Sequence, residues 1–233
     1  MLTWLKKLLT LPNTSFYKEI HTVLGFMPNK IEIYHQAFCH RSVNDKTYGN
    51  NERLEFLGDA IFNTVITEHL FDKLPNKDEG ELTDIRSKIV SRKSLNQLAK
   101  KLKIDSLVRT NLGNQIPSSI YGNTLEALIA AIYLDQGSKV CKEFISKKIL
   151  QAHFSLNQLE QEISSYKKHF IQWAQKNNKI YSFRLLNEAG EAHNKNFKIG
   201  LFLKEKKIAT ASAGSKKKAE EAASKKACHT LAI

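Results

Sequence analysis

The stretch Asn51-Glu-Arg-Leu-Glu-Phe-Leu-Gly-Asp59 begins a helix that we expect to continue to about residue 71. At about 100° per residue, the carboxylates of Glu52, Glu55 and Asp59 share one face within an arc of about 60°. The opposite face carries the apolar residues expected in the core, namely Leu54, Leu57, Ile61 and Val65. Carboxylates on one helix face repel each other, and such oxygen ligands are typical of Mg²⁺ or Mn²⁺ sites. The alternative interpretation is an acidic face in contact with solvent.

A second polar pair lies on a helix that we predict over residues 122–135. Asn123 and Glu126 are three residues apart and therefore share a face, which two alanines flank. Small residues allow another helix to approach, and buried polar groups need partners. We therefore expect this face to pack against that of Glu55 and Asp59, so that four oxygen-bearing side chains converge on a cation. Alternatively, Asn123 caps the helix and Glu126 is a surface acid.

Phe56 lies on the carboxylate side of the first helix, away from its core-facing stripe. An aromatic side chain in such a place lies either beneath a loop or in contact with another chain. The second interpretation predicts a homodimer.

Charge and composition narrow the class of partner. Basic residues number 36 and acidic residues 23 among 233, so the formal net charge is +13. Such an excess favours a polyanion, usually nucleic acid and less often an anionic membrane surface. The longest apolar run, 127–134, has eight residues, whereas a membrane span needs about 20. The three cysteines are scattered without a CxxC pair, which indicates a reducing cytoplasm and neither a disulfide framework nor a zinc site.

Most of the excess charge lies near the carboxyl end. Residues 164–233 hold 15 basic and 5 acidic residues, against 21 and 18 in the rest of the chain. We therefore predict an all-helical domain over 15–140, a helix end and polar linker over 141–163, and a small basic domain over 164–233. The pattern of the last part predicts an α+β fold, with two helices on one face of a three-stranded antiparallel sheet. The expected ranges in chain order are 166–175, 181–186, 196–203, 208–213 and 215–231.

The last predicted helix has Lys216, Lys217 and Lys218 in its first turn. The helix dipole disfavours cations there, and departures from a local rule often mark function. Together with the free N–H groups of the helix end, the three ammonium groups are suited to phosphates. The alternative interpretation is a solvated lysine run.

The motifs together resemble the ribonuclease III family. The stretch 51–59 resembles the family signature, and His40-Arg41-Ser42 precedes it. Asp78-Glu79-Gly80 follows, and residues 122–135 resemble the family's second metal-binding stretch. A near-identical block with three ordered companions is far more specific than a lone motif, and the resemblance covers nearly the whole chain.

The resemblance implies a metal site and its catalytic residues. Glu55, Asp59, Asn123 and Glu126 occupy the family's four metal positions, of which Asp59 and Glu126 are usually assigned as catalytic. Asn123 departs from the more frequent Asp at its position. Its amide oxygen can still bind a hard cation, but a negative charge is lost, so we expect weaker metal binding.

Three further positions match the family pattern. Glu52 and Glu79 match acids of the cleft whose role is secondary, and Phe56 matches the aromatic residue that docks into the partner subunit. The resemblance thus implies a homodimer with two sites along one valley, each cutting one strand of a double-stranded RNA.

The carboxyl-terminal part resembles the double-stranded RNA-binding domain. Its contact positions carry Gln172 on the first helix, His193 between the first two strands, and the lysine cluster 216–218. Such domains recognise A-form shape and 2′-hydroxyl groups over about 16 base pairs, with little sequence preference. The alternative for His193 is a loop histidine without a role.

The predicted activity is that of an endoribonuclease that depends on Mg²⁺, for which Mn²⁺ substitutes, without a small-molecule cofactor or a membrane. The resemblance implies 5′-phosphate and 3′-hydroxyl ends with short 3′ overhangs, and cytoplasmic processing of ribosomal and other structured RNAs. The alternative is a catalytically impaired double-stranded RNA-binding protein of the same fold, for which only Asn123 argues. A general DNA-binding protein fits the charge but not the A-form reader.

Overall fold

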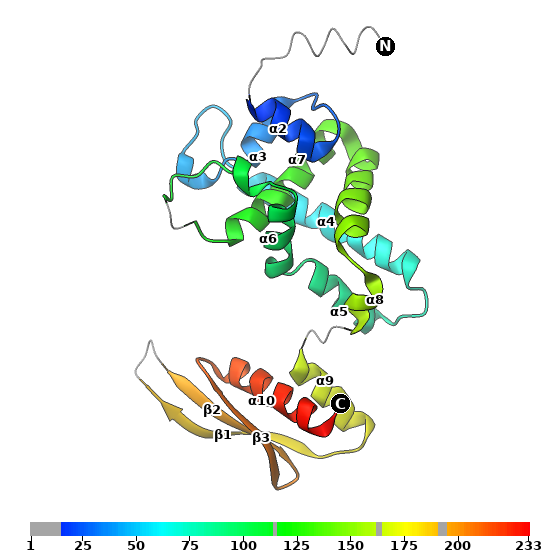
Figure 1. Ribbon diagram of the computed structural model, residues 1–233, viewed down its shortest axis with the longest axis vertical. Coiled ribbons are helices and arrows are strands. Elements are labelled where there is room, and N and C mark those ends of the chain that lie inside the picture. Colours follow the sequence, from blue (N-terminus) through cyan, green and yellow to red (C-terminus); the bar gives the residue numbers. More distant parts are fainter. Residues whose placement is uncertain (1–14, 114–115, 162–164, 191–194) are drawn as a thin grey trace. The chain divides into compact units, whose positions relative to one another are not determined.

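The computed structural model describes residues 15–113, 116–161, 165–190 and 195–233. The chain divides into two compact units, one up to Glu160 and one from Gln161 onward, and each has its own apolar core. The first unit is built from helices, and the second combines a sheet with two helices (Figure 1). The predicted fold class, an all-α domain followed by a small α+β domain, is therefore confirmed.

The first unit has α4 and α7 at its centre, and these two long helices pack against each other. The described segments in chain order are α2 (Ser15–Leu24), α3 (Ile31–Ala37), η1 (Arg41–Val43), α4 (Glu52–Lys73), α5 (Glu79–Ile89), α6 (Arg92–Lys101), η2 (Asp105–Leu107), α7 (Ser119–Phe144), the π-helical η3 (Ile145–Gln151) and α8 (Leu156–Gln161).

The buried face of α4 differs slightly from the predicted stripe. Leu54 and Val65 are buried as expected, but Leu57 and Ile61 are only half-buried at the margin of the core. Gly58 occupies a central position instead, because α7 packs directly against it. The residues that α4 buries are Leu54, Gly58, Phe62, Val65, Ile66 and Leu70.

The helix α7 is longer than the predicted range 122–135 and is interrupted soon after it. Gly137 has φ 82° and ψ 173°, a non-helical conformation that glycine adopts without steric penalty. Just before this break, the Asp135 carboxylate accepts the backbone N–H groups of Asn29 at 3.0 Å and Lys30 at 2.8 Å. Asp135 thereby fastens the start of α3 to α7.

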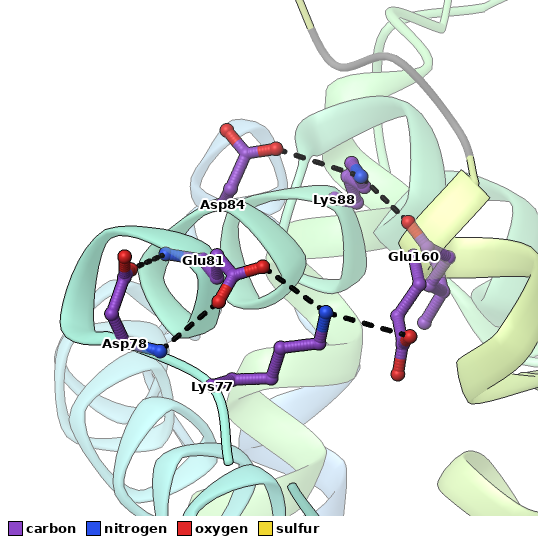
Figure 2. Close-up of polar contacts among 7 residues, drawn as sticks. Lys77, Asp78, Glu81, Asp84, Lys88 and Glu160 are labelled. Atoms are coloured by element: carbon purple, nitrogen blue, oxygen red, sulfur yellow. Dashed lines mark hydrogen bonds and ion pairs between the residues drawn. The ribbon is translucent and has the colours of Figure 1, made fainter.

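The last helix of the first unit, α8, is fastened by two lysines, one on α5 and one in the segment just before it (Figure 2). The side chain of Lys88 is only 8% exposed; it donates to the backbone carbonyl of Leu159 at 2.6 Å and pairs with Asp84 at 3.5 Å. Lys77 approaches the Glu160 carboxylate at 3.8 Å. These contacts hold the end of the first unit against α5.

The second unit contains α9 (Tyr166–Lys176), β1 (Tyr181–Ala189), β2 (Asn196–Leu203), β3 (Lys206–Ala213) and α10 (Lys216–Leu231). The strands form an antiparallel sheet in the order β1-β2-β3. Both helices contribute to one core on the sheet, as predicted (Figure 1). Its fully buried residues include Phe170 of α9, Leu201 of β2 and Ala223 of α10.

The cysteines and the hydropathy of the helices bear on the predictions of a reducing compartment and of a chain without a membrane span. Cys39, Cys141 and Cys228 are all buried free thiols. In the part of the chain that the structure describes, no helix is long and apolar enough to cross a bilayer.

Candidate active site

A cleft of about 1000 Å³ in the first unit collects the predicted acidic side chains. The helix α4 contributes Glu55 and Asp59, and α7 contributes Asn123 and Glu126. The four positions expected to hold a metal therefore line one cavity, together with further residues of the prediction, Glu52 and Phe56.

Glu79, by contrast, is not among the residues that line this cleft. It lies in the first turn of α5, where its carboxylate accepts a hydrogen bond from Thr83 Oγ1 at 3.0 Å. Because α5 begins beyond the far end of α4, this turn is separated from Asp59 by about 20 Å of helix, at 1.5 Å per residue. Glu79 therefore lies apart from the four proposed metal ligands of its own chain, and its role as a secondary acid stays a prediction.

Gly58 is the reason that α4 and α7 can meet at the cleft. A Cβ atom at this position would overlap the carbonyl oxygen of Glu126 and lie 2.5 Å from its carbonyl carbon. Only glycine permits this approach, which brings Asp59 and Glu126 to the same cavity. The two helices pack closely, as expected. The prediction rested on the alanines of α7, but the small residue that permits the approach is Gly58 of α4.

A second contact fixes the start of α7 against α6. The backbone N–H of Gly122 donates to Asn96 Oδ1 at 2.9 Å. A Cβ at Gly122 would lie 2.8 Å from that same oxygen and 3.1 Å from Leu95 Cβ. The neighbouring Asn123 is therefore held at a defined position beside the cleft.

The carboxylates of the cleft disfavour one another's charge. Burial, followed by the charges of Asp59 and Glu55, raises the pKa of Glu126 to about 7. Burial also raises the pKa of Glu55, although a hydrogen bond with the Asn123 side chain opposes that shift. Groups with pKa values perturbed in this way, gathered in a cleft, are typical of functional sites.

Neighbouring side chains orient individual groups of the cleft. Asn63 Nδ2, one helical turn beyond Asp59, donates to Asp59 Oδ1 at 2.8 Å. His40 Nδ1 accepts the backbone N–H of Ser42 at 3.2 Å, so the proton of the neutral imidazole lies on Nε2. Sequence reasoning missed the role of Asn63, although its spacing of four residues from Asp59 was a usable signal.

The donor set fits a hard divalent cation, but the site is not preassembled. Three carboxylates and one amide supply the oxygen ligands that Mg²⁺ and Mn²⁺ prefer. Within the described ranges, however, no three His, Cys, Asp or Glu side chains gather closely enough to hold a metal ion. Mutual repulsion of the carboxylates, seen in the raised pKa of Glu126, is a physical reason for side chains to stay apart without a cation.

Phe56 is 83% exposed, which agrees with its predicted position away from the core. It lines both the acidic cleft and a neighbouring hollow of about 680 Å³ that includes Leu57 and Leu134. The interpretation as a residue beneath a loop is therefore wrong, because a covered side chain would not be exposed. Contact with another chain remains the explanation to be tested.

The predicted contact residues of the second unit lie at its surface where they are described. Lys216, Lys217 and Lys218 occupy the first turn of α10 and are exposed, and Gln172 is exposed on α9. Lys216 Nζ lies 5.7 Å from the centre of the Phe197 ring. His193 lies outside the described residues.

Comparisons with known proteins agree with this arrangement. The family model described as Ribonuclease-III-like matches residues 30–153, and that of the double-stranded RNA binding motif matches residues 166–231. Ribonuclease 3 of Zunongwangia profunda is 44% identical over 222 residues, which cover 93% of this chain and 91% of the relative. Ribonuclease 3 of Flavobacterium psychrophilum is 40% identical over 216 residues, with 91% and 88% covered.

Solved structures of the ribonuclease III nuclease domain from Campylobacter jejuni are similar to the first unit. One is 29% identical with a TM-score of 0.55 and covers 61% of this chain and 99% of that chain. Another is 31% identical with a TM-score of 0.53, and 58% and 96% are covered.

The fold, the acidic cleft and the matched families define the class of protein: an endoribonuclease with a helical nuclease domain followed by a double-stranded RNA-binding domain. More specifically, the chain belongs to the ribonuclease III family, as its similarity to the ribonuclease 3 proteins over nine tenths of its length shows.

Proposed function

We propose that the chain acts as a homodimeric, Mg²⁺-dependent endoribonuclease in the cytoplasm, leaving 5′-phosphate and 3′-hydroxyl ends with short 3′ overhangs. One observation carries the proposal: four oxygen-bearing side chains line one cleft, in which burial and then repulsion by Asp59 and Glu55 raise the pKa of Glu126 to about 7. A divalent cation would relieve that repulsion. Ribosomal RNA precursors and other structured RNAs are the proposed substrates.

The residues of the cleft have distinct roles in this proposal. Glu55, Asp59, Asn123 and Glu126 would hold the metal, with Asp59 and Glu126 as the catalytic pair. A bound Mg²⁺ would neutralise the phosphodiester and lower the pKa of a water oriented for in-line attack. Mn²⁺ prefers the same oxygen ligands and is expected to substitute.

The protein groups around these ligands support their orientation. Asn63 holds one oxygen of Asp59 through a hydrogen bond of 2.8 Å. Asn123 donates its amide hydrogen to Glu55, which leaves its carbonyl oxygen for a cation. Without a cation, burial and the charges of Asp59 and Glu55 raise the pKa of Glu126 to about 7, and a bound cation would favour its ionised form.

The homodimer is supported by Phe56, whose ring is 83% exposed beside an apolar hollow. One of the similar Campylobacter jejuni structures is described as flexible in a region involved in dimer formation of its nuclease domain. By analogy, we propose that Phe56 packs against a second copy of this chain.

A duplex RNA of about 30 base pairs tests the activity, since it exceeds the about 16 base pairs that one RNA-binding domain covers. The full-length protein is incubated with end-labelled duplex, with Mg²⁺, with Mn²⁺ or with EDTA. Denaturing gels show cleavage, and phosphatase and ligase treatment identifies the ends. We expect metal-dependent fragments with 5′-phosphates. Binding of the duplex in a gel-shift assay without cleavage in either metal would instead support the impaired RNA-binding protein, for which the loss of charge at Asn123 argues.

A further inference from the structure

The acidic cleft is also lined by a positively charged side chain that the proposed metal site does not explain. Arg92, the first residue of α6, lines the same cavity as Glu55 and Glu126. Arg41 lines it as well, but its guanidinium is paired with Glu52 at 3.2 Å. For Arg92 the described part of the chain supplies no hydrogen bond or ion pair, and the side chain is exposed.

The packing of α6 places Arg92 at the acidic end of the cleft. Arg92 and Asn96 are four residues apart and therefore lie on one face of α6. Asn96 Oδ1 accepts the N–H of Gly122 at 2.9 Å, and Gly122 directly precedes Asn123. The face that carries Arg92 is thus held against the start of α7, where the cleft residues of that helix begin. Lys93, about 100° further around α6, is not among the residues that line the cleft.

The charge of Arg92 acts on the carboxylates, although the helix itself disfavours it. Arg92 opposes the rise in the pKa values of both Glu55 and Glu126. A cation in the first turn of a helix is unfavourable to the helix dipole, and α6 has no acidic residue in that turn. Helix stability therefore does not explain an arginine at this position. Binding of an anion in the cleft would explain it.

We propose that Arg92 contacts a phosphate of the RNA backbone beside the acidic side chains. Guanidinium groups bind phosphate oxygens in a bidentate fashion. A metal ion that occupies the carboxylates would release Arg92 from balancing their charge, so its guanidinium becomes available when the substrate is present. The inference rests on the proposed function, because it requires an RNA phosphate in this cleft. The inference identifies a substrate-binding residue. Its positive charge does not replace the negative charge that is absent at Asn123.

Three full-length variants test the proposal: Arg92→Ala, Arg92→Lys and Lys93→Ala. The last is a matched control, since it removes one positive charge from the same turn of α6 outside the cleft. Cleavage of the duplex under single-turnover, saturating conditions is expected to slow at least about tenfold in Arg92→Ala. Lys93→Ala should change the rate less than about twofold, and Arg92→Lys should recover part of the loss because it keeps the charge but not the planar fork.

A second measurement separates substrate contact from a structural role. In the absence of RNA, Mg²⁺ is expected to raise the melting temperature of Arg92→Ala at least as much as that of the wild type, because a neighbouring cation that repels the metal has been removed. Slow cleavage with this shift retained supports the proposal. Equal cleavage rates in Arg92→Ala and Lys93→Ala would overturn it, and so would a variant that loses cleavage and the Mg²⁺ shift together. A wild-type protein that binds but never cuts the duplex would show that the proposed function itself has failed.

Discussion

At Gly58, the backbone of α4 lies so close to Glu126 that no Cβ atom fits. The contact brings the acidic positions of two helices to one cavity, so this residue affects the cleft without contributing a functional group to it. A larger residue there must move α7 or α4, because the obstructing atoms belong to the backbone.

Gly58→Ala is therefore expected to lower the free energy of unfolding by about 1–3 kcal/mol, as overpacking does, and to slow cleavage of duplex RNA. Urea denaturation and the cleavage assay measure the two effects. Gly80→Ala is the control, because its Cβ would meet only a side-chain oxygen of Asp78 at 3.3 Å. A Gly58→Ala protein with the stability and rate of the control would contradict the assigned role of this contact.

The pKa of Glu126 gives a prediction for the metal-free protein. Its rise from 4.5 to about 7 means that the folded chain holds this proton more tightly than the unfolded chain. Stability is therefore lost as pH rises through this interval. Between about pH 4.5 and 7, the free energy of unfolding should fall more steeply in the wild type than in Glu126→Gln. Denaturation in EDTA at a series of pH values measures this, with Glu143→Gln on the exposed end of α7 as control; equal slopes in wild type and Glu126→Gln would exclude the assignment.

At the scale of elements, the first turn of α10 is the clearest candidate for contact with phosphates. Lys216, Lys217 and Lys218 are exposed there, next to the free N–H groups of the helix start, whereas Lys225 and Lys226 lie more than two turns from that start. Lys225 Nζ lies 5.3 Å from the centre of the Tyr166 ring, and Lys226 donates to the carbonyl of Thr210 at 3.1 Å.

Replacing Lys216, Lys217 and Lys218 by alanine is expected to weaken duplex binding and to reduce the slope of log K against log salt by about 3, since each phosphate contact contributes close to one. Fluorescence anisotropy with a labelled duplex at several salt concentrations measures the slope. The double variant of Lys225 and Lys226 should alter it less. An unchanged slope in the triple variant would place the binding surface elsewhere.

Periodicity along the chain predicts which residues of one element share a face, but not how distant elements meet. It therefore identified the faces of Glu55 with Asp59 and of Asn123 with Glu126, and it predicted the α-β-β-β-α order of the second unit. It could not identify Arg92 as a residue of the cleft, because that depends on the contact of α6 with Gly122. It could not place Glu79 relative to this cavity either, since the direction of α5 is set by tertiary packing.

For the whole molecule, the exposed ring of Phe56 predicts that the protein is a dimer. Phe56→Asp should shift it towards the monomer, because a charged side chain is unfavourable in an apolar contact. Sedimentation velocity over a range of concentrations measures the assembly state. Phe71→Asp is a control on the same helix, since Phe71 is also exposed, at 70%, but lines neither the cleft nor the neighbouring hollow. A Phe56→Asp protein that sediments like the wild type would place the interface elsewhere.

The central claim is that the acidic cleft of the first unit cuts duplex RNA. It is tested most directly by comparing Glu126→Gln with the wild type on a labelled duplex of about 30 base pairs in Mg²⁺, long enough for the RNA-binding domain. Cleavage and binding are measured in parallel on denaturing and native gels. We predict that Glu126→Gln binds the duplex nearly as tightly as the wild type and does not cut it. Cleavage by this variant at the wild-type rate would contradict the account, because the reaction would then not need this carboxylate.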